Sequence, residues 1–241
     1  MKRYFSLFII PVVMGIFFIS CNIVTDSGYQ MDEDRIIASE YSGISVESGI
    51  IVEFSNDMPS DNVEVSGDSN ILPYVQTYVN SSGVLVIKYK NRVNIRSKIW
   101  TTVTIPEIIN LKSVSASGGA RVRGHYEINS SNLKIDGSGG ANIALEGIFK
   151  TLDIEGSGGA KINIVGDAEK CIIDLSGGSN VRNFNLDTEI LNCSLSGGSD
   201  VEITCTEEMK IHASGGSKLH YKGDCQIIDI KLSGGSKVVK R

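Results

Sequence analysis

The sequence is poor in the residues from which most catalytic and metal-binding sites are built. Its 241 residues include three histidines, one tryptophan and four prolines. The spacing of His125, His212 and His220 does not match a metal site and predicts surface polar roles for them. No serine has a Gly-x-Ser-x-Gly setting, and no nucleophile, base and acid can be assigned as a set. The sequence therefore predicts a protein that is not an enzyme, with no metal site and no cofactor.

Positive charge is also in short supply. Lysine and arginine total 23 against 28 aspartates and glutamates, a formal net charge of −5. This sign argues against nucleic acid, and against anionic lipid headgroups, as the partner.

Long hydrophobic runs are absent except at the N-terminus. Lys2 and Arg3 precede an almost wholly apolar stretch, 7–19, which is too short to favour a spanning helix. Residues 1–20 therefore have the pattern of a secretory signal peptide. Phe18-Ile19-Ser20-Cys21 resembles a bacterial lipoprotein cleavage site. That resemblance implies lipid attachment at Cys21 and an outer membrane lipoprotein. Ordinary signal cleavage, leaving a free thiol, is the alternative.

Residues 21–40 are predicted to be a lipidated N-terminus followed by a flexible tether, because small polar and acidic side chains there supply little to bury. Strand-like runs then fill residues 41–110, with a short helical or irregular insertion around Pro73. No linker separates this part from 111–241. We therefore expect a single β-helix domain over 41–241, in which irregular coils over 41–110 begin and cap the structure.

What the second half has in abundance is one short motif, Ser-Gly-Gly followed by alanine or serine. The steps between its leading serines are 21, 19, 19, 20, 18 and 19 residues. A segment this short cannot bury an apolar face unless a neighbour stacks on it, so the period predicts a solenoid. The seven motifs begin at Ser117, Ser138, Ser157, Ser176, Ser196, Ser214 and Ser233.

Apolar residues alternate with period two on both sides of each motif, which is typical of strands. The copies read, for example, Leu152 and Ile154 before one motif, and Ile228, Ile230 and Leu232 before the last. These positions should form an aliphatic ladder inside a parallel β-helix with coils of about 19 residues. A leucine-rich repeat lacks support because its asparagine-containing consensus is missing. A glycine-serine linker would need no aliphatic residues at fixed offsets.

Several segments resemble the head GIN domain family of autotransporter adhesins, which is common in lipoproteins and secreted proteins of the Bacteroidetes group. The similarity spans about 41–241 and rests on the following residues together with the Ser-Gly-Gly run: Gly43-Ile44, Gly67-Asp68 followed by Asn70, Leu85 to Tyr89, and Val103-Thr104-Ile105-Pro106. The resemblance implies a right-handed β-helix, an envelope location and an adhesive role. It marks no binding residue.

Two columns of outward side chains are candidate sites. Asp136, Glu155 and Asp174 should stack at the coil spacing, where a Ca²⁺ ion could bind or neighbouring lysines such as Lys134 could screen them. A second, basic and polar stripe is either a solvated face or a surface for an acidic or hydroxyl-rich chain such as a glycan. It is interrupted by Asp200 and comprises Arg121, Asn142, Lys161, Asn180, Lys218 and Lys237.

The cysteines after Cys21 fall into two classes. Cys171 and Cys193 occupy inward positions and are expected to act as small hydrophobes. Cys205 and Cys225 lie almost in register on adjacent coils, so a disulfide between them is predicted in an exported protein.

These observations favour a non-catalytic, lipid-anchored, adhesin-like or scaffold protein of the envelope. A glycan-active β-helix lyase or hydrolase is the first alternative. The second is a structural protein that associates with copies of itself, since the last coil ends soon after Ser236 and an uncovered coil edge invites strand pairing.

Overall fold

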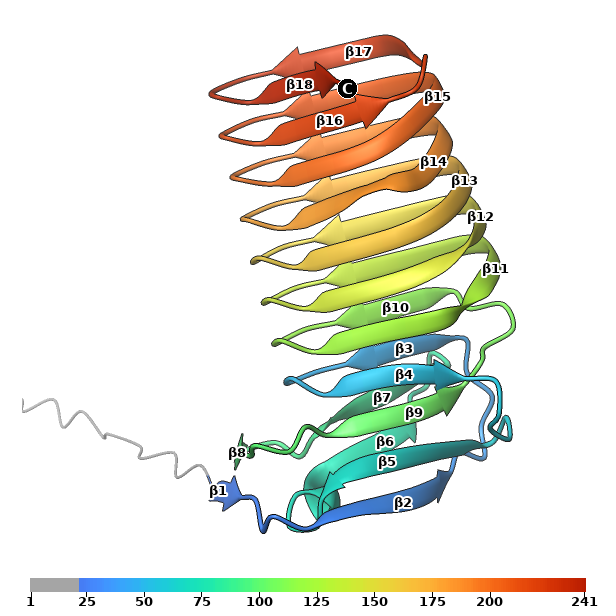
Figure 1. The fold of residues 1–241 in the computed structure, drawn as a ribbon, viewed down its shortest axis with the longest axis vertical. Helices are drawn as coiled ribbons and strands as arrows, with labels where there is room; N and C mark the ends of the chain where they lie inside the picture. The colour runs from blue at the N-terminus through green and yellow to red at the C-terminus, as the bar shows by residue number, and fades with distance from the viewer. Residues whose placement is uncertain (1–21) are drawn as a thin grey trace, which may run out of the picture.

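The Ser-Gly-Gly repeats form successive coils of a β-solenoid, as predicted (Figure 1). The computed structural model describes residues 22–241, so the predicted signal peptide and Cys21 lie outside the described residues. Successive coils pair in parallel. The chain runs from left to right along the near face of Figure 1, returns along the far face and rises toward its C-terminus, which makes the solenoid right-handed. The coil strands are β11 (Arg121–Gly137), β12 (Asn142–Gly156), β13 (Lys161–Leu175), β14 (Asn180–Leu195), β15 (Asp200–Ala213), β16 (Lys218–Lys222), β17 (Gln226–Leu232) and β18 (Lys237–Lys240).

The N-terminal strands extend both faces of the solenoid and then change direction. One face continues from β11 through β10 (Ser113–Ala116), β3 (Gly43–Val46) and β7 (Val84–Tyr89) to β6 (Val75–Val79). The other continues through β4 (Ile51–Ser55), β9 (Thr102–Pro106) and β5 (Asn62–Asp68) to β2 (Gln30–Ile36). The strands β6, β5 and β2 join antiparallel, so regular coiling stops at this end.

Two smaller features complete this end of the molecule. A 3₁₀ turn, η1 (Leu72–Tyr74), begins next to Pro73, where an irregular insertion was predicted. Strands β1 (Asn22–Thr25) and β8 (Val93–Arg96) form a separate two-stranded parallel sheet. The coil of β3 and β4 lies between β7 with β9 and β10 with β11, so the first coil in sequence is not the first in the stack.

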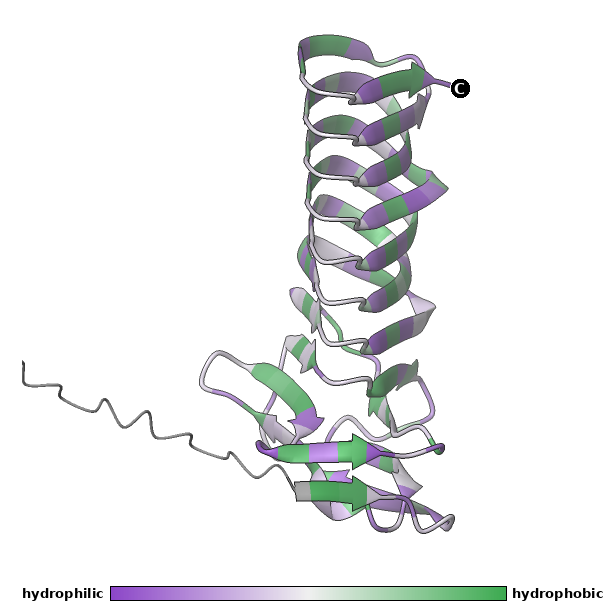
Figure 2. Cartoon of the chain, turned by 90° about the vertical axis from the view of Figure 1, so that its left-hand side faces the viewer, coloured by the Kyte–Doolittle hydropathy of each residue, from purple (hydrophilic) through white to green (hydrophobic). Residues whose placement is uncertain are grey.

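Inward side chains stack in columns, and the alternation of apolar and polar residues continues from coil to coil (Figure 2). Burying one aliphatic side chain contributes about 1.5–3 kcal/mol, so the columns supply most of the cohesion between coils. Cys171 and Cys193 fill such positions, as predicted, and burial raises the pKa of both thiols. One buried column consists of Leu133, Leu152, Cys171, Leu191 and Met209.

The last coil departs from the predicted ladder in two ways. Ile230 and Leu232 stack on Ile211 and Ala213 but remain 48% and 45% exposed, because within the described chain no coil covers them. A bulge after Met209 pairs that residue with Ile227 rather than with Ile228. The prediction that Ile228 joins the inward column is therefore wrong.

The predicted tether over 21–40 is also wrong for most of its length. Strand β2 pairs with all of β5 in antiparallel register, from Gln30 beside Asp68 to Ile36 beside Asn62. The segment before β2 is held by Asp68, whose side chain is fully buried. Its Oδ2 accepts hydrogen bonds at 2.8 Å from the backbone N–H groups of Ser27 and Gly28. The polar composition of 21–40 predicted a tether, because the sequence of this segment does not show that β5, which lies far away in the chain, pairs with it.

The carboxyl of Asp68 is held in its charged form. Burial alone would raise its pKa, but hydrogen bonds from Ser27, from the Asn70 N–H at 2.9 Å and from Gly28 outweigh burial and lower the pKa. A buried carboxylate with this many donors is satisfied rather than strained. It fixes the chain entering β2 against the turn that follows β5.

The turns at the Ser-Gly-Gly motifs adopt two conformations, and the fourth residue of the motif distinguishes them. Where it is alanine, both glycines have positive φ, as at Gly158 (59°) and Gly159 (88°). Where it is serine, positive φ is found only at the first glycine, as at Gly177 (70°). The buried hydroxyl of Ser179 donates to the carbonyl oxygens of Ser176 at 2.7 Å and Gly156 at 3.0 Å. The serine at this fourth position therefore caps the turn carbonyls.

Cys205 and Cys225 are both free thiols in the structure. Burial, followed by the neighbouring Cys225 thiol, raises the pKa of Cys205 to about 12, and its Sγ donates to the Glu208 carbonyl at 3.3 Å. Their disulfide stays a prediction.

Mass spectrometry of unreduced protein from the native envelope should find the peptides of Cys205 and Cys225 linked, and free thiols on both residues would contradict the predicted disulfide.

The two turn conformations predict different costs for one substitution at matched positions. Gly159 and Gly178 are the second glycines of adjacent motifs, and an added Cβ meets nothing within 4 Å at either. Only Gly159 has positive φ. Gly159→Ala should therefore destabilise the protein by about 1–2 kcal/mol, whereas Gly178→Ala should be near neutral or slightly stabilising. Thermal melting by circular dichroism compares them, and equal melting temperatures would contradict this account of the turn.

The hydrogen bonds that Asp68 accepts from the segment before β2 predict a local effect when the charge of Asp68 is removed. Asp68→Asn should weaken the pairing of β2 with β5, because the new amide presents donors to donors, and hydrogen exchange of 30–36 should rise while β12 stays protected. Since the folded-state pKa is lowered, the stabilisation exists above the unfolded pKa and is lost as the pH falls through the folded value. Acidification below about pH 4 should therefore loosen β2 in the wild type. Unchanged hydrogen exchange of 30–36 in the variant would contradict this role of Asp68.

Candidate functional site

The predicted acidic column exists, and lysine screens it. Asp136, Glu155 and Asp174 lie side by side in successive coils on the face that begins with β10. Lys134 Nζ lies 2.6 Å from Glu155 Oε1. Asp153 stands in the neighbouring column, where burial and then the charges of Glu155 and Asp174 raise its pKa, partly offset by Lys134. Within residues 22–241, no three or more His, Cys, Asp or Glu side chains are grouped to hold a metal ion.

The predicted basic and polar stripe is also in register. Each member pairs with its counterpart in the next coil, from Arg121 in β11 to Lys237 in β18. Asp200, which interrupts the stripe, is neutralised by Arg182 at 2.7 Å. At the lower end the guanidinium of Arg121 lies 4.5 Å from the ring centre of Trp100, a cation–π contact. The stripe is on the face opposite the acidic column, along the strands that follow each turn.

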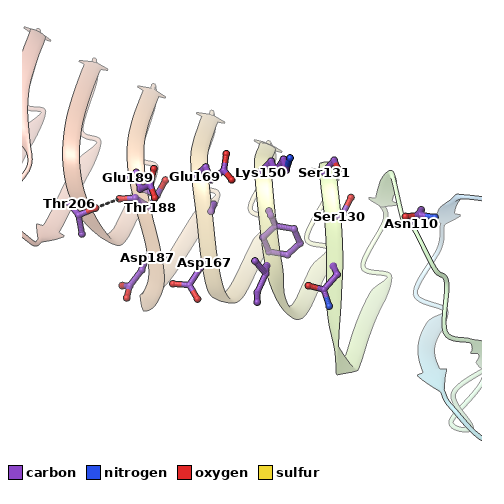
Figure 3. A pocket seen from close by; sticks show the side chains of 14 residues that line it. Asn110, Ser130, Ser131, Lys150, Asp167, Glu169, Asp187, Thr188, Glu189 and Thr206 are labelled. Atoms are coloured by element: carbon purple, nitrogen blue, oxygen red, sulfur yellow. Dashed lines mark hydrogen bonds between the residues drawn. The ribbon is translucent and has the colours of Figure 1, made fainter.

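A groove that the sequence analysis missed runs across β11 to β15, where each coil bends toward its returning strand (Figure 3). It has a volume of about 580 Å³. A second groove of about 550 Å³ adjoins its N-terminal end and extends along the strands of the same coils toward Lys134 and Asp153; the two share Asn110, Ser130 and Ser131. The first groove is an open channel parallel to the solenoid axis.

Two outward columns form the walls of the groove. The first contains Asn129, Ile148, Asp167 and Asp187, which pair in register. The second contains Ser131, Lys150, Glu169 and Glu189, each two residues further along its coil. In Figure 3 the carboxylates of Asp167 and Asp187 lie in the lower part of the view and those of Glu169 and Glu189 in the upper part, further along the same coils.

The floor between these walls is built from residues that turn inward. Ser130, Phe149, Ala168 and Thr188 pair in register and are all buried. The Ser130 hydroxyl donates to the Leu111 carbonyl at 2.7 Å. The Thr206 hydroxyl donates to the Thr188 carbonyl at 3.3 Å, the bond drawn in Figure 3. The polar floor atoms are therefore used internally, and the wall side chains are left to meet a ligand.

A local break in the alternation creates the corner. Buried residues occur three apart rather than two at this point of each coil, as at Ser130 and Leu133 or Ala168 and Cys171. Two consecutive outward residues lie between them, and the backbone must bend there. The repeated pairs Asp167 with Glu169 and Asp187 with Glu189 accompany this break. These two signals together could have located the groove from the sequence.

A third group of polar residues lies near the last coils. His212 Nε2 is 2.9 Å from Asp229 Oδ2, and Lys231 is 3.5 Å from the same oxygen. The hydrogen bond with His212, more than the charge of Lys231, lowers the pKa of Asp229. Ser194 and Ser214 share a shallow groove of about 350 Å³ with His212. Surface exposure of His212 and Asp229 favours an ordinary ion-pair cluster here.

The described residues contain no helix long and apolar enough to cross a membrane. No curated protein matches the chain. Solved structures do resemble it, at identities that show the fold alone. A putative adhesin from Bacteroides fragilis is 21% identical with a TM-score of 0.76, covering 90% of this chain and 97% of that one. A putative adhesin from Parabacteroides distasonis is 20% identical with a TM-score of 0.72, covering 91% and 100%.

A further structure from Parabacteroides distasonis, described as a putative lipid binding protein, is 18% identical with a TM-score of 0.70, covering 91% of this chain and 100% of that one. The family model described as putative auto-transporter adhesin, head GIN domain, matches residues 40–225, more than half of the sequence. The chain therefore belongs to the head GIN domain family of putative auto-transporter adhesins.

Proposed function

We propose that this protein is a non-catalytic, adhesin-like module that binds an extended, hydroxyl-rich chain such as a glycan in its axial groove. In this proposal lipid on Cys21 anchors it to the outer membrane. The observation that carries the proposal is the continuity of the groove from Asn110 across β11 to β15. Membership of the adhesin-like family supports an exported, surface role.

The shape of the groove favours a linear ligand. Parallel strands lie about 4.8 Å apart, so each wall offers a side chain at that interval along the axis. The walls present amides and a hydroxyl at the N-terminal end, one ammonium at Lys150, and carboxylates beyond it. Carboxylates and amide oxygens accept hydrogen bonds, while amide nitrogens and lysine donate them. A chain of sugar hydroxyls can satisfy both kinds of partner in succession.

The side chains of the groove favour binding over cleavage. A β-helix lyase uses a basic catalytic residue, and the basic residues that line the two grooves are three lysines, Lys112, Lys134 and Lys150. Glu155 engages Lys134 at 2.6 Å, and the lining of neither groove includes an arginine or a histidine.

The proposal predicts which face a ligand needs. A glycan and matrix-protein array with the purified protein should give a signal that Asp167→Asn with Asp187→Asn weakens by about tenfold or more, since hydrogen bonds to charged groups contribute about 1.5–3 kcal/mol each. The matched control, Lys161→Gln with Lys218→Gln, alters the predicted stripe and should leave the signal unchanged.

Two results would overturn this assignment. Loss of binding in the control alone would move the ligand to the stripe of Arg121 to Lys237. Release of reducing ends in a polysaccharide cleavage assay, run beside the array, would show an enzyme and contradict the non-catalytic role.

A further inference from the structure

A strongly basic segment of the molecule lies at its N-terminal end, around β8. Residues 89–100 contain Lys90, Arg92, Arg96 and Lys98 and no acidic residue. All four cationic side chains are exposed. They form what we call the basic patch. The net charge of −5 argues against anionic headgroups as a partner of the whole surface, but it does not describe this part of it.

Exposed apolar side chains accompany the basic patch. Trp100, the only tryptophan of the chain, follows Lys98 by two residues and is 56% exposed. Ile23 in β1 pairs with Asn94 in β8 and is 54% exposed. Tryptophan beside cationic side chains is the combination found where proteins meet the headgroup region of a bilayer. The stacked guanidinium of Arg121 adds a further charge next to the ring.

The fold ties this surface to the proposed lipid site. Asn22, which follows Cys21 in the chain, pairs with Val93 in the middle of the basic patch. Two further contacts hold β1 and β8 together. The backbone N–H of Asp26 donates to the Arg96 carbonyl at 3.2 Å, and the Lys98 N–H donates to Asp26 Oδ2 at 2.9 Å. Asp26 places one carboxylate here, and its Oδ2 accepts the hydrogen bond from Lys98.

We propose that the basic patch, with Trp100 and Ile23, docks on the surface of a membrane that contains anionic lipid. The inference rests on the proposed lipid anchor, which would hold the protein at a membrane, although the patch itself should bind without lipid on Cys21. Basic residues near an anionic surface contribute additively, and an acyl chain combined with a polybasic patch anchors far better than a single acyl chain. In Figure 1, β1 and β8 lie at the lower end of the molecule, away from the C-terminal coils. Docking there leaves the axial groove uncovered.

Vesicle binding by residues 22–241, which contain every described strand, tests the patch without lipid on Cys21. The protein should sediment with vesicles of phosphatidylcholine and phosphatidylglycerol and much less with phosphatidylcholine alone. Added salt should release it, because exposed charges are screened. Since Trp100 is the only tryptophan, its fluorescence should shift to the blue and be quenched by brominated lipid.

A matched pair of variants localises the effect. The variant with Lys90, Arg92, Arg96 and Lys98 changed to glutamine should lose at least about tenfold in vesicle affinity. The control, with Lys161, Lys210, Lys218 and Lys237 changed to glutamine, removes the same charge from the solenoid and should bind as the wild type does. Equal loss in both variants, equal binding to both kinds of vesicle, or an unquenched Trp100 would overturn the proposal.

Two features keep the test decisive. If the patch variant does not fold, the salt and quenching measurements on the wild type still decide. The anchor is tested separately, by incorporation of labelled palmitate into the wild type but not into Cys21→Ala. A failure there removes the lipidated setting and leaves the vesicle result standing, whereas a failure of the vesicle experiment leaves the anchor and the groove untouched.

Discussion

Parallel backbone pairing between successive coils is the constraint on which the rest of this structure depends. It places each residue beside its counterpart in the next coil, so a residue type that recurs at one position of the repeat forms a column. Aliphatic residues that recur at an inward position therefore form a column without any further long-range contact. Outward columns bring like side chains within about 4.8 Å of each other, which is unfavourable for charges. Lys134 relieves that repulsion by pairing with Glu155 from the neighbouring column, and Arg182 pairs with Asp200 in the same way.

The same pairing limits what the turns can do. An added Cβ at Gly158 would lie 3.2 Å from the backbone nitrogen of Gly139 in the coil below, so the first glycine is required by space and by φ together. The second glycine is less restricted by space, and its φ differs between the two kinds of motif. When serine replaces alanine at the fourth position, its buried hydroxyl takes over turn carbonyls and the backbone leaves the positive-φ region, as it does at Gly178.

Periodic local signals made the solenoid predictable from sequence, and non-local pairing hid the remainder. The register of the columns and the burial of Cys171 follow from the Ser-Gly-Gly spacing. The pairing of β2 with β5 does not, because a polar strand gains its order from a distant partner and from Asp68. The bulge that selects Ile227 over Ile228 is a one-residue slip that no period predicts. The groove was missed because alternation was followed only near the turns, while the break lies at the opposite corner.

Charge illustrates why composition and placement lead to different conclusions. A net negative value describes the chain, whereas binding depends on the field where a partner approaches. The carboxylates gather in the groove and on the face of Asp136, and the cations of 89–100 gather around β8. An acidic groove held near an anionic membrane would repel that surface, while a basic patch at the base of the molecule would be attracted to it. The two distributions therefore favour one orientation, with the patch toward the lipid and the groove toward solvent. Strands β3, β10, β11 and β12 lie between β7, which precedes β8 in the chain, and β13, where the carboxylates of the groove begin, and each pairing step spans about 4.8 Å. Because screening is strong beyond about 8–10 Å, each surface then acts with little influence from the other.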